Sequence, residues 1–297
     1  DTAAWNEGWT AFLTDLMAHM EANGWKERTY IGLAERGIDD AALTLIESVK
    51  GTDGKSFKKA GAMDSMDASH QALAIRIDDL NVGSMAIKGS RSNFDSMLAA
   101  RKETGLRTTV YSCTGHKPGN FSLSAPGESY WTMLYSYSVG GTGFLRWAYD
   151  SWVADPLRDT SHAKFEAGDC FLIFPDEKTA QNPVIHSRLR LVKMSLGVRD
   201  VNKLMIIKGN CPAMESAVAT LAATVRPTYD SSGYYLTDAG KTALANDMKA
   251  LRQGIVTLTA EYEERLATGD TKKLNLQPQD VPLVNLPEQY QGDVYGY

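Results

Sequence analysis

Carboxylates stand at the ends of several predicted strands of this sequence. Glu35 follows one apolar run, Asp78 and Asp79 follow another, and Asp150 closes a third. The carboxyl ends of parallel strands meet on one face of an α/β barrel, so acids placed there can share one substrate in acid–base catalysis. An acid after a strand also commonly caps the next helix, which is the stronger interpretation for Asp78 and Asp79. For Glu35 the catalytic interpretation is the stronger one.

An aromatic and charged block, FLRWAYDSW, occupies residues 144–152. Aromatic faces stack on the apolar faces of sugar rings, while arginine and aspartate hydrogen-bond sugar hydroxyls. Strand alternation would bury about half of the block, so Trp147 or Trp152 could instead belong to the core. The excess of aromatics beside acids favours a carbohydrate substrate. The predicted substrate-binding residues are Arg146, Trp147, Tyr149 and Asp150 of this block, together with Tyr111, Trp131 and Asp78.

Residue types that bind metals or act as nucleophiles show no useful spacing. The five histidines form no HxH or HxxxH pair, the three cysteines form no CxxC, and GxSxG does not occur. Three cysteines cannot all pair, so buried free thiols are the expectation, with a single disulfide as the alternative. We therefore predict no metal and no cofactor.

The charge balance argues against nucleic acid and membranes as partners. The chain of 297 residues has 31 basic and 36 acidic side chains, for a net charge of −5 without a basic stripe. Its apolar runs are far shorter than the roughly 20 residues of a membrane span. The chain begins at Asp1 inside an amphipathic pattern, as a mature or truncated product would, so the missing signal segment decides nothing about compartment.

The elements that must position these residues alternate along the chain. Apolar spacing predicts a first helix over 5–22, ended by Gly24 in a left-handed cap. Further helices are predicted over 39–49, 91–103, 126–138, 187–200, 212–224 and 238–267. Strands are predicted over 29–34, 72–78, 106–112, 142–148 and 169–174.

Alternating strands and helices favour a parallel sheet in an α/β fold. We expect a (β/α)8 TIM-barrel-type domain over 1–268, with extra C-terminal helices and an extended surface tail over 269–297. Five strands are too few to close the barrel, so its first strands are expected upstream or on another chain. An open sheet is the alternative, but no glycine-rich phosphate loop follows the first strand.

Several motifs together resemble one enzyme family. They are a helix that ends in GW, the strand YIGL-x-ER, the block GFLRWAYDSW, AGD at 167–169, SRLR at 187–190 and GVRD at 197–200. From about Trp5 to Tyr262 the chain resembles the catalytic domain of glycoside hydrolase family 123. The resemblance implies a barrel glycosidase that acts on β-linked N-acetylgalactosamine, in a bacterial protein that is secreted, periplasmic or on the cell surface.

The resemblance also implies a mechanism without an enzyme nucleophile. The acetamido oxygen of the substrate attacks the anomeric carbon, a Glu with a raised pKa protonates the leaving oxygen, and an adjacent Asp orients the acetamide. Glu35 matches the acid/base, but Ala34 stands where the family has the Asp. A methyl group cannot stabilise the developing charge, so we expect a loss of about 10²–10³ in kcat from this change.

Three explanations of Ala34 remain open. The chain could be a deliberately inactivated variant, a natural homologue of different specificity, or a sugar-binding protein without catalysis. In the second case another carboxylate, such as Asp78, Asp79 or Asp150, could replace the missing one. We predict a glycoside hydrolase with an oligosaccharide or glycoconjugate substrate, and a non-catalytic binding protein is the alternative.

Overall fold

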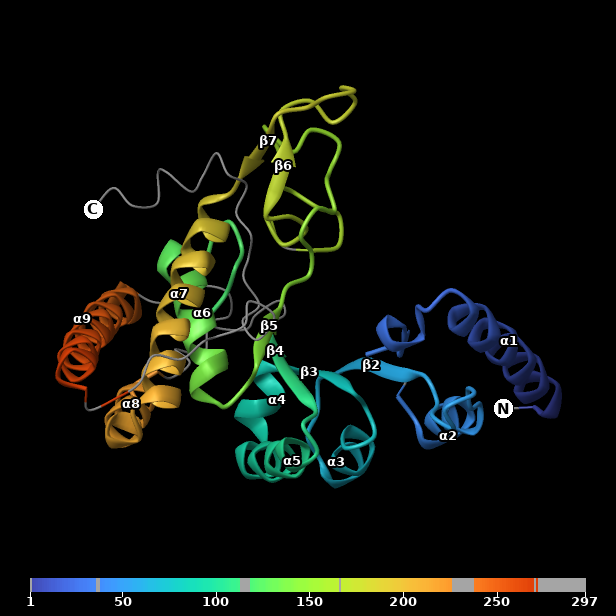
Figure 1. The fold of residues 1–297 in the computed structure, drawn as a ribbon. Helices are drawn as coiled ribbons and strands as arrows, with labels where there is room; N and C mark the ends of the chain where they lie inside the picture. Colours follow the sequence, from blue (N-terminus) through green and yellow to red (C-terminus); the bar gives the residue numbers. More distant parts are fainter. Residues whose placement is uncertain are drawn as a thin grey trace. The chain divides into compact units, whose positions relative to one another are not determined.

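A computed structural model describes residues 2–35, 38–112, 118–165, 167–225, 238–269 and 271 (Figure 1). The chain divides into two compact units, Asp1–Cys113 and Thr114–Tyr297. The expected single domain over 1–268 stays a prediction. The expected surface tail lies, apart from residues 269 and 271, outside the described residues.

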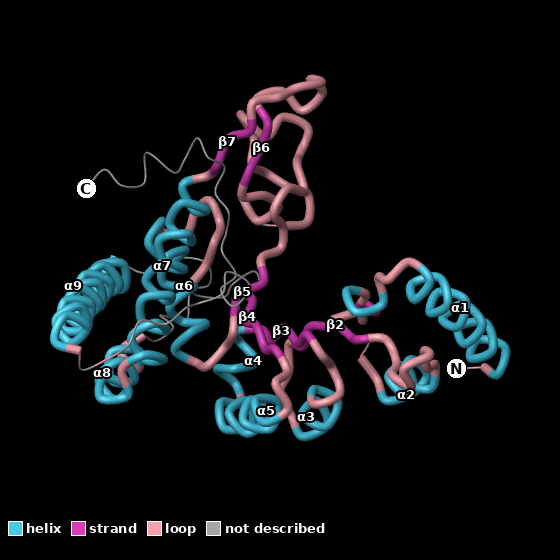
Figure 2. Tube along the Cα trace, in the orientation of Figure 1, coloured by secondary structure: helices cyan, strands magenta, loops and turns pink. Residues whose placement is uncertain are grey.

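The first unit contains a parallel sheet. Its strands are β1 (Tyr30–Gly32), β2 (Lys58–Met63), β3 (Asp79–Gly83) and β4 (Arg107–Tyr111), paired in this order. Its helices are α1 (Ala3–Ala22), α2 (Asp40–Ser48), α3 (Ala68–Ala74), α4 (Ser84–Gly89) and α5 (Arg91–Glu103), with a short 3-10 helix at Lys26–Arg28. Figure 2 shows α2, α3 and α5 on the same side of the strands.

Strand alternation gives the sheet two different faces. On the helix side lie buried residues such as Met63, Leu80 and Val110. The opposite face carries smaller or polar side chains, among them Asn81 and Thr109, which are only partly buried. The sheet therefore buries one face, which carries most of its large apolar residues, and leaves the other face only partly covered.

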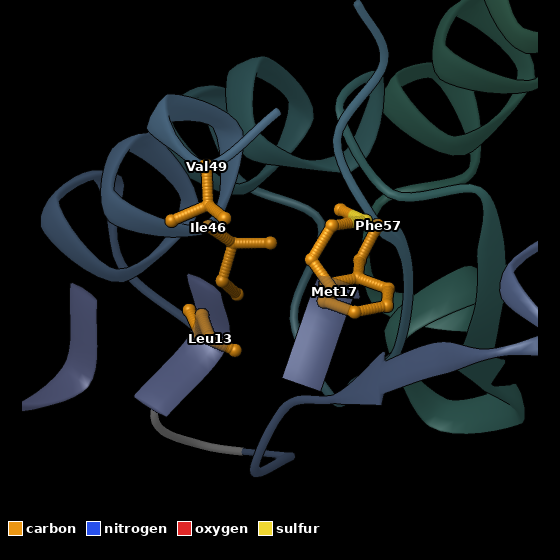
Figure 3. Packing of buried hydrophobic residues seen from close by; sticks show 5 residues of the cluster. All are labelled: Leu13, Met17, Ile46, Val49 and Phe57. Carbon is orange, nitrogen blue, oxygen red and sulfur yellow. The ribbon is translucent and has the colours of Figure 1, made fainter. Parts of the chain in front are cut away.

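Helix α1 attaches to this unit through an apolar cluster. Leu13 and Met17 of α1 pack with Ile46 of α2 and with Val49 and Phe57 beyond it (Figure 3). All five side chains are at most 5% exposed. Burying side chains of this size contributes about 1.5–3 kcal/mol each. The cluster thus fixes the helix that precedes β1.

A buried arginine holds the loops that enter β3 and β4. Arg101 of α5 is 0% exposed. It donates to Thr108 Oγ1 at 2.8 Å and to the carbonyl oxygens of Ala74 and Ile77 at 2.6 and 2.5 Å. Burial lowers the pKa of its guanidinium to about 10. Its hydrogen bonds compensate for the loss of water around the charge.

The second unit is mainly helical. It contains α6 (Pro126–Ser138), α7 (Leu189–Asn210), a 3-10 helix (Pro212–Met214), α8 (Glu215–Ala222) and α9 (Asp238–Thr268). Strand β5 (Gly143–Leu145) follows α6, and β6 (Ile173–Pro175) pairs antiparallel with β7 (Ile185–Ser187). At Gly197 an added Cβ would lie 2.7 Å from Tyr130 O, so α6 and α7 pack closely at a position without a side chain.

Most predicted elements are confirmed, but two strands were predicted wrongly. The segment 72–78 contains the end of α3 and the turn after it, because Asp67 caps a helix there by accepting from His70 N at 3.0 Å. The segment 169–174 contributes only the start of β6, which belongs to a hairpin rather than to a parallel sheet. Strand β2 was missed because its sequence, KKAGAM, lacks a strong apolar pattern.

The expected fold is confirmed at the level of a mixed α/β structure with a parallel sheet. Among the described strands, β1 lies at an edge of the order β1-β2-β3-β4, and the described residues show no closed barrel. No helix in the described part of the chain is long and apolar enough to cross a membrane. The two described cysteines, Cys170 and Cys211, are buried and free, as expected, while Cys113 lies outside the described residues.

Candidate functional site

The predicted acid lies just beyond the carboxyl end of β1. The strand ends at Gly32, and Leu33 N continues the ladder by donating to Ala60 O of β2 at 2.8 Å. Ala34 follows, then Glu35 in a turn, and both are exposed. The chain thus delivers Glu35 to the edge of the sheet where parallel α/β folds place catalytic groups.

Tyr111 holds this acid from the end of β4. Its hydroxyl donates a hydrogen bond to the Glu35 carboxylate. A hydrogen bond between a donor and an ionised acceptor is stronger than one between neutral groups, so it fixes the orientation of the carboxylate. The sequence predicted Tyr111 as a substrate-binding residue. In the structure its hydroxyl contacts the predicted acid, Glu35. Two strands that are distant in sequence therefore meet at one acid.

Gly83 leaves the space that Tyr111 needs. It pairs with Tyr111 in the register of β3 and β4. A Cβ atom at Gly83 would lie 3.1 Å from Tyr111 Oη and 3.2 Å from Cζ. Contacts this short are tighter than ordinary van der Waals distances, so the ring passes directly over the glycine. The backbone of Gly83 is ordinary extended strand, and its small size is the property that counts.

Asn81 and Thr109 form a polar pair on the same sheet face, two residues before Gly83 and Tyr111 in their strands. The Thr109 hydroxyl donates to Asn81 Oδ1, and Asn81 Nδ2 donates to Gly61 O at 3.2 Å. Asn81 and Gly83 were missed from the sequence because β3 was placed too early in the chain. The signal was present as the short run LNVG between Asp79 and a helix.

Asp78 and Asp79 lie at the other edge of the sheet. Asp79 begins β3 and pairs with Ala60 and Arg107, and Asp78 directly precedes it, so both acids lie at the start of a strand rather than at its end. Asp78 Oδ2 accepts from Lys59 N at 2.8 Å and lies 3.6 Å from Lys59 Nζ. The prediction that they join Glu35 at a strand end is wrong, because the strand runs in the next segment.

In the second unit, Arg146 forms a buried ion pair. Its Nη1 lies 2.7 Å from Asp169 Oδ1, and both side chains are 7% exposed. Nη2 also donates to Asp169 O at 2.6 Å, and Ala148 N donates to the same carbonyl at 3.0 Å. Removing one partner of such a pair leaves an uncompensated charge. Arg146 therefore anchors the predicted sugar-binding block to the AGD segment.

The aromatic rings of this block are exposed. Trp147 is 55% and Tyr149 44% exposed, values unusual for such large rings. Phe165 lies beside Trp147 with ring centroids 5.8 Å apart. Asp150 is also exposed and bridges to Phe171 through the backbone. Their exposure is compatible with stacking on a sugar, and the role in sugar binding stays a prediction.

Two other aromatic candidates behave differently. Trp152 is partly buried and donates from Nε1 to Ile173 O at 2.8 Å, so it supports the start of the hairpin. Trp131 in α6 is 0% exposed. The prediction that Trp131 contacts sugar is wrong, because its position on α6 places the ring in the core of the second unit.

The SRLR segment clamps the loops around this block. Arg188 donates to Gly168 O at 3.0 Å, to Phe171 O at 3.2 Å and to Ser122 Oγ at 2.7 Å. Burial and the nearby charges of Arg190 and Arg146 lower the pKa of Arg188 to about 10. Gly168 has φ +82°, a conformation that favours glycine. Two separate sequence motifs, AGD and SRLR, are therefore parts of one contact.

Within the described ranges no group of three or more His, Cys, Asp or Glu side chains could hold a metal ion. The chemistry available around Glu35 is that of a carboxylic acid beside a phenol. The chemistry available around Trp147 is ring stacking and hydrogen bonding. A carboxylic acid can protonate a glycosidic oxygen, and exposed aromatic rings can stack on a sugar.

Comparison with known proteins agrees with this chemistry. The model of the glycoside hydrolase 123 catalytic domain matches residues 1–207. The chain belongs to glycoside hydrolase family 123. This assignment covers both Glu35 and the aromatic block. Comparison with curated proteins found no match.

A solved structure extends the family assignment to the fold. A family 123 glycoside hydrolase from Clostridium perfringens, studied for glycolipid glycan hydrolysis, is 32% identical with a TM-score of 0.83. The similarity covers 90% of this chain and 47% of that one, so the family 123 chain described here spans about half the length of its relative.

Proposed function

We propose that this family 123 chain carries the acid/base centre of a glycoside hydrolase that cleaves β-linked N-acetylhexosamine, with N-acetylgalactosamine as the first candidate sugar. The observation that carries the proposal is Glu35, exposed at the carboxyl edge of a parallel sheet and held by the hydroxyl of Tyr111. Because the Clostridium relative was studied for glycolipid glycan hydrolysis, glycolipid glycans are candidate substrates.

The proposed reaction retains configuration through the substrate's own acetamido group. The acetamido oxygen bonds to the anomeric carbon as the glycosidic bond breaks, and Glu35 gives its proton to the leaving oxygen. Water then attacks the anomeric carbon, the bond from the acetamido oxygen to that carbon breaks, and Glu35 takes a proton from the water. Tyr111 keeps the Glu35 carboxyl in position during both steps. Trp147 and Tyr149 of the second unit stay predicted sugar-binding residues.

The fold proposal is a (β/α)8 barrel. Parallel strands β1–β4 with helices on one face form the local arrangement of such a barrel. The edge of β1 in the described sheet can accept a further strand. Export to the periplasm, cell surface or medium also belongs to the proposal, and cell fractionation tests it.

A non-catalytic glycan-binding protein is the second candidate, and Ala34 is the observation that favours it. The family resemblance places an Asp at this position, and Ala34 removes the group that would orient the acetamide. The exposed rings of Trp147 and Tyr149 would still bind sugar. Binding without turnover would then be the function.

Hydrolysis of 4-nitrophenyl N-acetyl-β-D-galactosaminide decides between the two. We expect turnover by the native chain or by Ala34→Asp, and loss of at least about 10²-fold in either when Glu35→Gln removes the acid. Binding of the sugar without turnover by either chain would favour the glycan-binding protein. Turnover that survives Glu35→Gln would show that the acid is another residue.

A further inference from the structure

Two further rings of the second unit extend the aromatic surface that Trp147 begins. Phe165 lies beside Trp147, with ring centroids 5.8 Å apart and ring planes at 56°. His162 in turn lies beside Phe165, with ring centroids 5.0 Å apart and ring planes at 40°. The three rings form a continuous row, called the aromatic strip from here on. Phe165 and His162 were missed from the sequence because they lie outside the block 144–152.

The aromatic strip lies at the surface of the protein. Trp147 and His162 are exposed, and Phe165, which contacts both, is partly buried. Single exposed apolar residues are common on protein surfaces and need no explanation. Several rings gathered into one exposed row are more typical of a surface that binds a ligand.

Both segments of the aromatic strip are anchored to the AGD segment at 167–169. The buried ion pair between Arg146 and Asp169 fixes the backbone next to the tryptophan of the strip. Gly168 N donates to Thr160 O at 2.9 Å and closes the base of the loop that carries the other two rings. A fixed backbone loses less conformational entropy when a ligand binds, so this anchoring prepares the strip for a ligand.

His162 adds a hydrogen-bond donor to the aromatic strip. Its Nδ1 accepts a hydrogen bond from Lys164 N at 3.1 Å. Because a backbone N–H can only donate, Nδ1 carries no proton in this contact, and the proton of the neutral ring is on Nε2. A row of rings with an N–H donor matches a sugar, which has apolar ring faces and hydroxyl oxygens at its edges.

We propose that the aromatic strip binds two consecutive sugar units of a glycan, one on Trp147 and its neighbour on Phe165 and His162. The inference rests on the proposed function for the class of ligand. A pyranose ring is about as large as one aromatic ring, so a row of three rings has room for a second unit. The strip therefore makes the chain prefer an oligosaccharide to a single N-acetylgalactosamine.

Calorimetry on the Glu35→Gln chain tests the strip, because this change prevents turnover during the measurement. Two ligands are compared: methyl N-acetyl-β-D-galactosaminide, and a tetrasaccharide with sugars on both sides of its β-linked N-acetylgalactosamine. We expect the tetrasaccharide to bind at least about 3-fold more tightly than the methyl glycoside, because the second unit stacks on Phe165. Equal affinities for the two ligands, or no binding of either, would overturn the inference.

Phe165→Leu then assigns the preference to the strip, because leucine keeps an apolar side chain and removes the ring. We expect it to abolish the advantage of the tetrasaccharide and to change the affinity for the methyl glycoside less than about 2-fold. Phe165→Tyr keeps the ring and should keep the advantage. An advantage that survives Phe165→Leu, or an equal loss for both ligands, contradicts the proposed second sugar contact.

Two further variants complete the design. His162→Phe keeps a ring and removes the Nε2 donor, so it should weaken tetrasaccharide binding about 2- to 5-fold, and an unchanged affinity would overturn the role of the donor. The matched control is Trp25→Leu, which removes an exposed ring beside His19 in the first unit and should leave both affinities unchanged. Unchanged circular dichroism and melting temperature establish that each variant is folded.

Hydrolysis separates this inference from the proposed function. If neither the native nor the Ala34→Asp chain turns over while the tetrasaccharide keeps its advantage, the enzymatic function fails and the strip stands. If a chain turns over and the advantage is absent, the enzyme stands and the strip is overturned.

Discussion

Gly83→Ala should impair the acid through Tyr111 without touching Glu35. The new methyl would lie 3.1 Å from Tyr111 Oη and 3.2 Å from Cζ, so the ring must move by a few tenths of an ångström. That movement lengthens the hydrogen bond from Tyr111 to the Glu35 carboxylate. We expect a loss of about 0.5–1.5 kcal/mol, or about 2- to 10-fold in kcat.

Tyr111→Phe sets the upper limit of this effect. It removes a hydrogen bond to an ionised group, which is worth about 1.5–3 kcal/mol, or about 10- to 150-fold. Both losses should be larger for substrates with poor leaving groups, because these depend more on protonation by Glu35. KM should change little in either variant, since the hydroxyl acts on the acid.

A double-mutant cycle provides the assay. kcat is measured for an alkyl and an activated aryl glycoside, in the native or Ala34→Asp background, whichever turns over faster. Once Tyr111→Phe has removed the hydroxyl, Gly83→Ala should have almost no further effect. Gly89→Ala is the control, because a Cβ there meets nothing within 4 Å. Additive losses would refute the reasoning, since Gly83→Ala would then act by a route other than Tyr111.

Three further predictions concern stability and binding. Arg101→Met should lower the free energy of unfolding, measured in urea, by about 3–5 kcal/mol, because it leaves buried carbonyl oxygens and Thr108 without their donor. The control is Arg91→Met, which replaces an exposed arginine on the same helix and should lower it by less than about 1 kcal/mol. Burial raises the pKa of Glu47, but its hydrogen bond from Arg76 and the charge of Lys59 lower it more, so the net shift is downward. Its stabilising contribution is therefore present above pH 4.5 and lost as the pH falls through the folded value, and Glu47→Gln should flatten the fall of melting temperature in acid. Trp147→Ala should weaken sugar binding, measured by calorimetry, about 5- to 10-fold. Trp131→Ala should instead destabilise the fold by about 3–5 kcal/mol, measured by urea unfolding.

Much of the secondary structure could be predicted from local signals. The stripe on α1, the Gly24 cap with φ +68° and the boundaries of α5 and α6 are carried by residues close together in sequence. The error at 72–78 has a physical cause: a short run of alanine, leucine and isoleucine fits either a helix or a strand. The Asp67 cap decides for the helix, and the strand then begins at Asp79.

The sequence by itself indicated the family, and it singled out Glu35 and the aromatic block as candidates, because residue types and short motifs carry that information. Only the tertiary structure decided which groups meet. The arrangement of the strands brings the Tyr111 hydroxyl to the Glu35 carboxylate and the Tyr111 ring over Gly83. It also places Asp78 at the edge of the sheet opposite to Glu35. Register is set by packing across the whole sheet, and no local run of residues encodes it.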